Sequence, residues 1–335
     1  MFNKLEIIKE KEDLNISGTF NTPILINDFP GSLTNWSWAK SQGYCTGSGT
    51  SGAPYIIQDH IFNTSSVISS CLTIMNSRKP FIVRDCFFIG VPAWAGVYLY
   101  NVTNGLITKN SNKVNTGALV YIENSSYNVI SYNNASYNAQ FGIYLWGGIG
   151  DIRNNIISNN LVVANIERGI FLQEHCYFNE ISENTVLNNT IGIVIDEWVS
   201  NNTITENLIK FNDAGLIIAA LCNGNMVYLN CFENKFLHAL DLGAFNQWDN
   251  GVKGNYWDNY TGMDADGNGI GDIPYNITGS AGTKDNFPLM TCPFPTSDGG
   301  GIPGYNFLMI LSIVGLITII GIYITLKKKE LEVRQ

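Results

Sequence analysis

The stretch NIISNNLVVANIERGIFLQ, residues 155–173, decides the fold because its pattern recurs along much of the chain. Asparagines stand at positions 155, 160 and 165, a glycine follows at 169, and the residues between them are mostly aliphatic. Related stretches return every 23 to 27 residues, as from Asn110 to Asn133 and from Asn133 to Asn160. Self-similarity at such a period is the sequence signature of a solenoid.

The repeat is clearest in three columns of asparagine that run in phase through six copies. Gly105 takes the place of asparagine in the first copy of one column, and Lys235 breaks another column in the last copy. The central column is Asn110, Asn133, Asn160, Asn184, Asn207 and Asn230; the preceding column is Asn128, Asn155, Asn179, Asn202 and Asn225; the third is Asn115, Asn138, Asn165, Asn189 and Asn212.

Each copy also carries a glycine followed by a strand-like run, such as GIYLW at residues 142–146. The first and third residues after the glycine are aliphatic in all six copies, and they face inward because side chains alternate along a strand. Two or three short strands per repeat, each ended by an asparagine or glycine that tolerates left-handed backbone angles, close one coil of a parallel β-helix.

We therefore predict an all-β fold, a single-stranded right-handed parallel β-helix, in which consecutive coils pair at roughly 4.8 Å. Stacked asparagine amides then hydrogen-bond from coil to coil and satisfy turn groups that would otherwise lack partners. A leucine-rich horseshoe shares the period, but its Leu-x-x-Leu-x-Leu frame with a helical side is absent from this chain.

Composition excludes several classes of protein. The chain has 335 residues, of which 45% are hydrophobic and 14% charged, and this excludes intrinsic disorder for most of it. The net charge is −9 and no basic stripe is present, so we expect no nucleic-acid partner. The seven cysteines form no Cys-x-x-Cys pair, which argues against a zinc ribbon or a redox motif. Most are expected to be buried, with room for one or two disulfides and at least one thiol unpaired.

The C-terminal region predicts a membrane anchor. Residues 307–326 are twenty residues without a charge, long enough for a transmembrane α-helix, and three lysines follow at once. This places the short tail in the cytoplasm and the β-helix outside. The predicted organisation is an N-terminal cap at 1–24, the β-helix at 25–290, a Pro/Gly linker at 291–304, the transmembrane helix at 305–326 and the tail at 327–335.

The N-terminus shows no apolar run long enough for a signal peptide, although an exported domain needs one. Either the true start lies upstream, or the protein is tail-anchored and faces the cytoplasm. Ten Asn-X-Ser/Thr sequons favour export, and we predict glycosylation at some of them: Asn15, Asn35, Asn63, Asn101, Asn124, Asn134, Asn188, Asn201, Asn259 and Asn276.

The second and fourth residues after each glycine point outward and form two columns. One is Tyr98, Leu119, Tyr144, Phe171, Val194 and Ile217; the other is Tyr100, Tyr121, Trp146, Gln173, Asp196 and Ala219. Rings in adjacent coils give a flat surface on which sugars can stack, and polar residues beside them suit sugar hydroxyls. The alternative is that the rings pack beneath a loop or stabilise neighbouring strands as ladders. The predicted carbohydrate-binding residues are Tyr98, Tyr100, Tyr121, Tyr144, Trp146, Phe171, Gln173, Glu197 and Trp198.

The same face offers a candidate catalytic pair. Glu174 and Asp196 lie one coil apart, and glycoside hydrolysis needs two carboxyl groups roughly 5–10 Å apart. A β-eliminating lyase would instead need a basic residue beside acids that hold calcium, for which Arg168 is the nearest candidate.

A candidate calcium loop follows the repeats. Gly269 stands where a sharp turn is needed, but position twelve is Tyr275 rather than a bidentate glutamate, so Asp258 or water would complete the site. The alternative is an Asp/Gly-rich turn that closes the last coil. The predicted ligands of a structural Ca²⁺ ion, at positions one, three, five, seven and nine, are Asp264, Asp266, Asn268, the carbonyl of Ile270, and Asp272.

The repeats, an entry segment at 47–57 and exit segments at 254–260 and 264–272 resemble NosD-like right-handed β-helix proteins over roughly residues 25–290. This superfamily is also described as carbohydrate-binding and sugar-hydrolysing, and the C-terminal arrangement looks like that of archaeal surface proteins. Ala53 stands where family members often carry Asp, and the catalytic Asp cluster of pectate-lyase relatives has no clear counterpart. The family name implies copper, but His60, His175 and His238 fall in different coils without Met or Cys partners.

These observations lead to an ordered set of functional expectations. The first is a membrane-anchored, surface-displayed module that binds a glycan or another surface polymer through the aromatic face. The second is a polysaccharide-degrading enzyme, a glycoside hydrolase or lyase. The third is a structural or adhesive spacer.

Overall fold

The computed structural model describes residues 17–64, 69–90, 94–113, 117–148 and 150–294. The chain separates into two compact units, residues 1–293 and 294–335, and the second lies outside the described residues except for Phe294. The predicted transmembrane helix and cytoplasmic tail fall in that second unit. Among the residues that are described, none of the helices is both long and apolar enough to cross a membrane.

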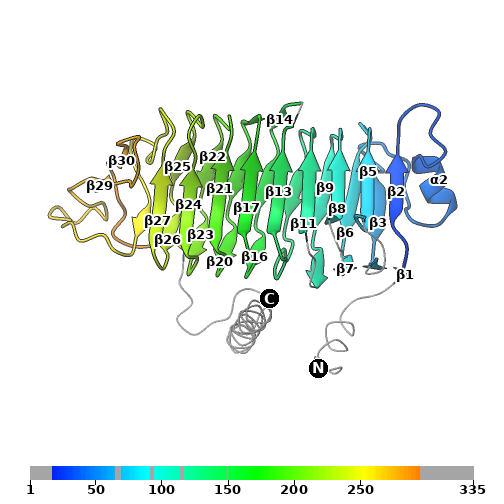
Figure 1. Ribbon diagram of the computed structural model, residues 1–335, viewed down its shortest axis with the longest axis horizontal. Coiled ribbons are helices and arrows are strands. Elements are labelled where there is room, and N and C mark those ends of the chain that lie inside the picture. The colour runs from blue at the N-terminus through cyan, green and yellow to red at the C-terminus, as the bar shows by residue number, and fades with distance from the viewer. Residues whose placement is uncertain (1–16, 65–68, 91–93, 114–116, 149, 295–335) are drawn as a thin grey trace, which may run out of the picture. The chain divides into compact units, whose positions relative to one another are not determined.

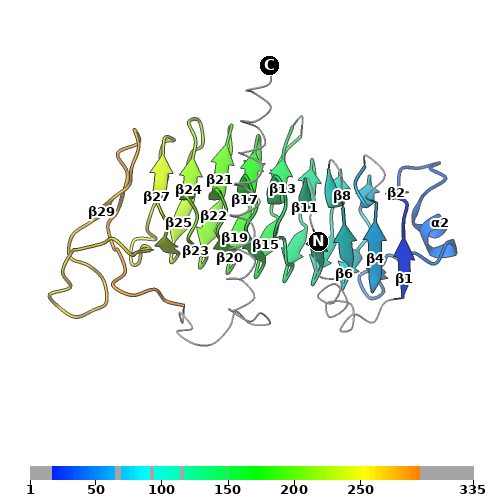
Figure 2. The same ribbon diagram turned by 60° about the horizontal axis from the view of Figure 1, so that its bottom comes forward.

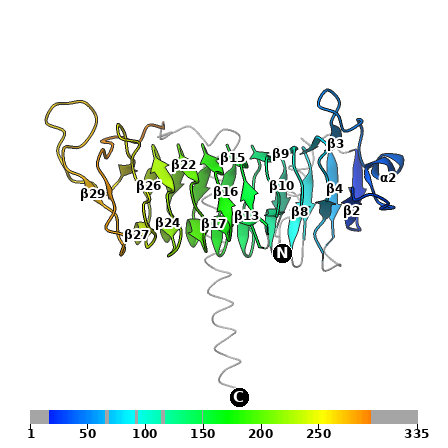
Figure 3. The ribbon, with the colours of Figure 1, turned by 90° about the horizontal axis from the view of Figure 1, so that it is seen from above.

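The first unit is a right-handed parallel β-solenoid of about eight turns, and its coils follow one another in chain order (Figures 1 and 3). Each coil contributes strands to three parallel sheets, which we call sheets I, II and III. The solenoid fold predicted from the repeat is confirmed.

Sheet I is the longest sheet and carries the candidate site. Its nine strands are β2 (Ile24–Asn27), β5 (Leu72–Met75), β8 (Ala95–Tyr100), β11 (Ala118–Glu123), β13 (Phe141–Trp146), β17 (Arg168–Gln173), β21 (Ile191–Asp196), β24 (Ala214–Ile218) and β27 (Leu237–Asp241). Sheet II has eight strands: β3 (Tyr55–Gln58), β6 (Phe81–Arg84), β9 (Gly105–Thr108), β12 (Val129–Ser131), β15 (Ile156–Ser158), β19 (Glu180–Ser182), β22 (Thr203–Thr205) and β25 (Met226–Tyr228).

Sheet III consists of two parts, some of whose strands are labelled in Figure 2. Asn134 bridges the two parts by pairing with Ser111 and Leu161. The first part is β1 (Gly18–Phe20), β4 (His60–Asn63), β7 (Phe87–Ile89) and β10 (Ser111–Lys113). The second part is β16 (Leu161–Val163), β20 (Thr185–Leu187), β23 (Leu208–Lys210), β26 (Cys231–Glu233) and β28 (Tyr256–Trp257). Two small sheets pair β14 (Ile152–Arg153) with β18 (Cys176–Tyr177) and β29 (Tyr275–Asn276) with β30 (Lys284–Asp285).

Aliphatic side chains in register fill the interior. In sheet I the strands pair so that equivalent residues of successive coils stand directly opposite one another. Burial of such a column stabilises the solenoid by roughly 1.5–3 kcal/mol for each large aliphatic side chain. One fully buried column is Val97, Val120, Ile143, Ile170, Ile193 and Leu216.

The central asparagine column forms a continuous hydrogen-bonded ladder, as predicted. Asn133 donates both its backbone N–H and its side-chain Nδ2 to Oδ1 of Asn160, each over 3.0 Å. Its Nδ2 also donates to the carbonyl of Ile107 over 2.9 Å, so each amide satisfies turn groups of the neighbouring coils. The ladder joins Asn110, Asn133, Asn160, Asn184, Asn207, Asn230 and Asn255.

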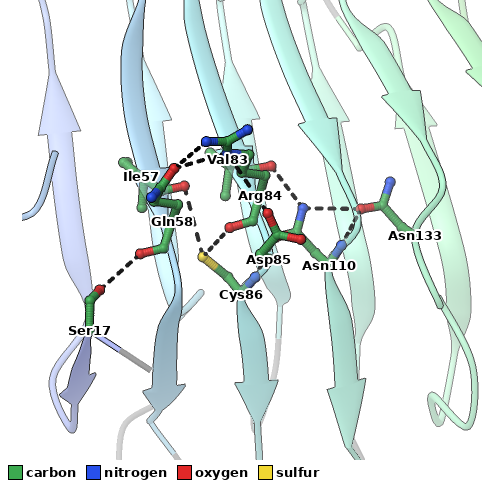
Figure 4. A network of polar contacts seen from close by, with 9 residues as sticks. All are labelled: Ser17, Ile57, Gln58, Val83, Arg84, Asp85, Cys86, Asn110 and Asn133. Atoms are coloured by element: carbon green, nitrogen blue, oxygen red, sulfur yellow. Dashed lines mark hydrogen bonds and ion pairs between the residues drawn. The ribbon is translucent and has the colours of Figure 1, made fainter. Parts of the chain in front are cut away.

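Figure 4 shows how this ladder begins. No asparagine precedes Asn110 in the column; Cys86 stands there and donates its backbone N–H to Asn110 Oδ1 over 3.1 Å. The Cys86 thiol turns back to the carbonyl of Arg84 over 3.2 Å, while the Arg84 guanidinium binds the side-chain oxygen of Gln58 over 2.6 Å. The backbone N–H of Cys86 therefore makes the same bond to the next coil as a ladder asparagine does, although its side chain is a thiol.

The other two columns also form ladders, with one correction. Lys235 does not break the third ladder, because the last coil is one residue shorter there and Asn234 takes the position instead. Asn212 Nδ2 donates to Asn234 Oδ1 over 2.9 Å. Asn115 lies outside the described residues. The second ladder joins Asn128, Asn155, Asn179, Asn202, Asn225 and Asn246, and the third joins Asn138, Asn165, Asn189, Asn212 and Asn234.

The left-handed corner residues differ from the prediction. We expected asparagine or glycine in this conformation, and several corners do hold one of them. The left-handed residue is the one before most ladder asparagines, however, and large side chains fill many of these places. Tyr132 has a φ of 56°, Glu183 also 56°, and Phe211 59°. A left-handed residue other than glycine costs roughly 1–2 kcal/mol, and the amide hydrogen bonds of the adjacent ladder offset this cost.

The ends of the solenoid are covered. At the N-terminal end, helix α2 (Trp36–Ser41) is capped by Asn35 and packs beside β2, and Trp36 stacks on Tyr55 at a centroid distance of 4.6 Å. At the other end, the disulfide between Cys231 and Cys292 ties the segment after β30 to strand β26. The remaining cysteines, Cys45, Cys71, Cys86, Cys176 and Cys222, are free and buried, as expected for most of them.

Candidate functional site

The register of sheet I changes one of the two predicted outward columns. Tyr98 pairs with Tyr121, which pairs with Tyr144, which in turn pairs with Phe171. Placing Leu119 between Tyr98 and Tyr144 was therefore wrong by two residues. The reason is that Gly117 is not the counterpart of Gly96: Gly117 lies against the backbone of Trp94, and Leu119 occupies the place of the repeated glycine.

The four rings of this corrected column stack on one another. Ring centroids lie 5.0 Å apart for Tyr98 and Tyr121, 4.8 Å for Tyr121 and Tyr144, and 5.0 Å for Tyr144 and Phe171. The Arg168 guanidinium lies 4.2 Å from the Phe171 ring centroid and closes the stack by a cation–π contact.

Stacking covers the ring faces. Tyr121 is only 7% exposed and Phe171 only 2%, so these two rings cannot offer a flat surface to a sugar as predicted. The column instead forms the ladder between neighbouring strands that was the alternative interpretation, and its phenol hydroxyls bond to side chains of the second outward column.

The phenol hydroxyls donate to a line of polar side chains. Tyr98 and Tyr121 both donate to Oε2 of Glu123, over 2.6 and 3.1 Å. Tyr144 donates to Oε1 of Gln173 over 2.6 Å, and Gln173 Nε2 donates to Oε2 of Glu197 over 2.9 Å. We call Tyr98, Tyr121, Glu123, Tyr144, Gln173 and Glu197 the polar ribbon.

Burial raises the pKa of Tyr98, and the carboxylate of Glu123 raises it further. Burial and the charge of Glu123 likewise raise the pKa of Tyr121. Both phenols therefore remain protonated and act as donors toward Glu123. This holds the Glu123 carboxylate in a fixed position on the outward surface.

Exposed or half-buried rings flank the polar ribbon. Tyr100, Glu123, Trp146, Gln173 and Asp196 form the second outward column in register. Tyr100 and Trp146 are half-buried and Trp198, two residues beyond Asp196, is 50% exposed. Trp198 stacks on His175 with ring centroids 5.8 Å apart. Three of the predicted sugar-binding rings thus remain accessible.

The predicted catalytic residues come to adjacent coils. The backbone N–H of Glu174 donates to the carbonyl of Asp196 over 3.1 Å, although the register partner of Asp196 is Gln173. Arg168 begins strand β17 and Glu174 follows its end, and the Arg168 guanidinium lies over the Phe171 ring, 4.2 Å from the ring centroid. A role for Arg168 as the base of a lyase site remains a prediction. Roles for Glu174 and Asp196 in acid–base chemistry remain predictions.

The candidate calcium loop is a tight turn. Asp264 accepts the N–H groups of Asn268 and Gly269 over 3.0 and 2.9 Å, and Asp272 accepts that of Ala265 over 2.8 Å. The hydrogen bond from Gly269 lowers the pKa of Asp264, so this carboxyl is ionised at neutral pH. Asp258, the further ligand expected from the sequence, lies 2.8 Å from His238 Nε2. The three carboxylates of this described loop, Asp264, Asp266 and Asp272, do not gather as a metal site requires. Calcium binding by Asp264, Asp266, Asn268, Ile270 and Asp272 remains a prediction.

Glu123 is a functional candidate that the sequence pattern did not reveal. It stands 23 residues after Tyr100, the same step that separates Tyr98 from Tyr121. Counting by this step, rather than from the nearest glycine, places Glu123 in the second column.

The fold and the outward face define a parallel β-solenoid with an aromatic and acidic surface on one sheet. Residues 44–153 and 148–262 match the family described as "Periplasmic copper-binding protein (NosD)". This match covers more than half of the chain, and the protein belongs to the NosD family. No curated protein matches the sequence.

Several solved structures are similar at low identity. Pectate lyase Pel9A is 11% identical, with 87% of this chain and 83% of that chain covered and a TM-score of 0.46. A double mutant of the periplasmic alginate epimerase AlgG is 15% identical, with 63% of each chain covered and a TM-score of 0.43. A tailspike mutant of E. coli bacteriophage HK620 is 14% identical, with 60% and 43% covered and a TM-score of 0.44. The chain therefore spans less than two thirds of the AlgG variant it matches.

Copper, which the family description names, does not fit the side chains present. Copper sites combine clustered imidazole and sulfur ligands. Throughout residues 17–294, apart from the short gaps between the described ranges, no three His, Cys, Asp or Glu side chains gather as a metal site requires. Burial also raises the pKa of the free thiols, to about 12 for Cys86, so they stay protonated. The histidines are engaged elsewhere: His60 with Ser17, His175 with Tyr177 and Trp198, and His238 with Asn234 and Asp258.

Proposed function

We propose that this protein binds carbohydrate, or another hydroxyl-rich surface polymer, across the outward face of sheet I. The main support is that the second outward column combines accessible aromatic rings with hydrogen-bond acceptors that are already held in place. Tyr100 and Trp146 stand on either side of Glu123, one coil away in each direction, at a spacing of roughly 4.8 Å per coil. A sugar ring has an apolar face and a hydroxyl edge, and this surface offers a partner to each.

The preorganisation of the acceptors supports binding. Glu123, Gln173 and Glu197 are already held by hydrogen bonds within the polar ribbon. Side chains that are ordered before a ligand arrives lose less entropy when it binds, and affinity rises accordingly. The parallel sheet beneath them is rigid because its core is fully buried.

The test is binding of the full-length protein to an array of polysaccharides, followed by titration of the best ligand. Trp146→Ala removes an accessible ring and is expected to weaken binding about tenfold, the loss of one stacking contact. Tyr132→Ala is the matched control, because Tyr132 is an exposed ring that precedes a central-ladder asparagine, away from the outward face of sheet I, and it is expected to leave affinity unchanged. Absence of binding to any glycan would favour the structural or adhesive role.

A polysaccharide-degrading activity is the second candidate, and one observation favours it: Glu174 and Asp196 lie on adjacent coils beside the accessible rings. Release of reducing sugar from a bound glycan, abolished in Glu174→Gln or Asp196→Asn, would establish it. Unchanged turnover in both variants would eliminate these two residues.

We further propose that the solenoid works outside the cytoplasm. The disulfide between Cys231 and Cys292 supports this, because disulfides persist in oxidising compartments. The sequons at Asn201, Asn259 and Asn276 are exposed and so accessible to glycosylation. The apolar segment at 307–326, outside the described residues, remains the proposed anchor. Membrane fractionation of the native protein, combined with intact-mass analysis, tests these proposals.

A further inference from the structure

We propose that the outward face of sheet I selects neutral, hydroxyl-rich glycans and rejects uronate polymers, with Glu123 as the specificity-determining residue. This inference rests on the proposed function and deepens it. It distinguishes this protein from proteins that bind uronate polysaccharides, in which each sugar carries a carboxylate.

The charge of the face is the first observation. The side chains of the second outward column and those directly after strands β17 and β21 include four carboxylates, and Glu123 and Glu197 belong to the polar ribbon. An anionic polymer laid along this column would bring its own carboxylates against them, and such like-charge contacts are strongly unfavourable where water is partly excluded. The four carboxylates are Glu123, Glu174, Asp196 and Glu197.

The nearby cations are the second observation, and they are engaged elsewhere. The Arg168 guanidinium lies over the rings of Phe171 and Phe141, 4.2 and 5.6 Å from their centroids. Arg153 pairs with Asp151, two residues away in sequence. Arg78, on the N-terminal side, donates to Asn101. Within the described part of this face, these three guanidiniums are therefore committed to rings, to a carboxylate and to an amide.

The hydrogen-bonding character of Glu123 is the third observation. Its Oε2 receives two phenol hydroxyls, over 2.6 and 3.1 Å, and an ionised carboxylate can only accept hydrogen bonds. A ligand that approaches Glu123 must therefore bring O–H or N–H donors. Sugar hydroxyls satisfy this requirement, and a uronate also carries them, but its C6 group is a carboxylate, which cannot donate to Glu123 and is repelled by it.

The experiment compares neutral and acidic ligands on the same protein. Full-length protein is titrated with hexasaccharides of glucose, xylose and mannose, and with hexamers of galacturonate and mannuronate. Each titration is run in EDTA and again with Ca²⁺, at low and at high salt. We expect the neutral ligand that binds best to bind at least tenfold tighter than either uronate, and we expect the gap to narrow at high salt because screening weakens the repulsion.

Glu123→Gln provides the decisive variant. It keeps a side-chain oxygen for the tyrosine hydroxyls but removes the charge, so uronate affinity is expected to rise about fivefold or more, and the ratio of neutral-glycan to uronate affinity is expected to fall. Glu183→Gln is the matched control: it removes an exposed charge from a sheet II corner and is expected to leave the discrimination unchanged. Thermal unfolding of both variants checks that they are folded.

The outcomes separate the two proposals. Uronates that bind as tightly as neutral glycans, with or without Ca²⁺, would overturn the specificity proposal and leave glycan binding intact. Neutral selectivity that persists unchanged in a folded Glu123→Gln protein would overturn the role of Glu123. Failure of every saccharide to bind would contradict the proposed function itself.

Discussion

Asn255 donates its backbone N–H to Oδ2 of Asp285 over 2.7 Å, and this bond ends the central asparagine ladder on a buried carboxylate. The ladder asparagines direct their backbone N–H groups toward the next coil on the C-terminal side, so the last asparagine of each ladder needs a different acceptor. The other two ladders end in the same way. Asn246 Nδ2 donates to Asp241 over 2.9 Å, and the Asn234 N–H donates to His238 Nδ1 over 3.2 Å.

The protonation of Asp285 predicts a pH dependence of stability. Burial raises its pKa from the ordinary 3.8 to about 6, while the N–H groups of Asn255 and Trp257 oppose this. Because the folded pKa is the higher one, this contribution is complete below pH 3.8 and is lost as the pH rises through about 6. A pKa difference of about two between the folded and unfolded states corresponds to about 3 kcal/mol.

The measurement is the free energy of unfolding in urea between about pH 3.5 and about pH 7.5 for the native protein and Asp285→Asn. Asparagine does not titrate, so the difference between the two curves isolates the contribution of Asp285. We expect the native protein to lose stability relative to the variant as the pH rises. Parallel curves would show that Asp285 does not titrate in this range.

Removal of one amide from the middle of the ladder predicts a large loss of stability. Asn160→Ala deletes the acceptor of the Asn133 N–H and the donor to the Ile130 carbonyl, all of them buried. Each unsatisfied buried group costs roughly 1–3 kcal/mol, so we expect a loss of about 2–4 kcal/mol in chemical unfolding. Gln140→Ala, an exposed amide, is expected to change stability by less than about 0.5 kcal/mol. Equal effects of the two substitutions would refute the role assigned to the ladder.

The left-handed corners predict opposite effects for two neighbouring glutamates. Glu183 is exposed with a φ of 56°, and Glu180 is exposed in the extended strand β19. Asparagine is enriched severalfold in the left-handed region and depleted in strands. Glu183→Asn is therefore expected to raise the free energy of unfolding by about 0.5 kcal/mol, and Glu180→Asn is expected to lower it by a similar amount. Thermal unfolding should show the same signs in the melting temperature. The same sign for both would contradict the energetic cost assigned to the left-handed backbone at the corners.

The loop that contains Asp264 predicts calcium binding that stabilises the C-terminal end. Titration calorimetry of the full-length protein is expected to show one site with an affinity tighter than millimolar, and Asp264→Asn to weaken it. Asp249→Asn removes an acid outside the loop and is the control. Heat changes that appear only above millimolar Ca²⁺ would leave the loop as a simple turn.

The period of the sequence predicted the solenoid because the asparagines that carry it make the contacts between coils. Each asparagine of the central column bonds to the equivalent asparagine of the next coil, as in the series Asn133, Asn160, Asn184 and Asn207. Residues one repeat apart in the sequence are therefore neighbours in the structure. The inward-facing aliphatic positions were predictable as well, because side chains alternate along a strand and only one of the two alternating sets can fill the interior.

The candidate site was harder to predict because its register depends on one coil with an irregular glycine. Gly117 lies two residues earlier than the repeat requires, and it moved Tyr121 and Glu123 out of their columns. Burial of Phe171 by stacking was also hidden, because outward-pointing rings on adjacent coils can turn their faces to one another as readily as to solvent. Neither property follows from the alternation of side chains alone.

The repeating hydrogen bonds of the asparagine ladders have an evolutionary consequence. Each internal winding presents the same amide to the winding before it and to the winding after it, so a further winding of this kind can be inserted without a change in the ladder contacts. Duplication or excision of such a unit would lengthen or shorten the molecule in increments of roughly 4.8 Å while both termini keep their seals. The length of the solenoid could thus be adjusted by the number of windings, independently of whatever its outward face recognises.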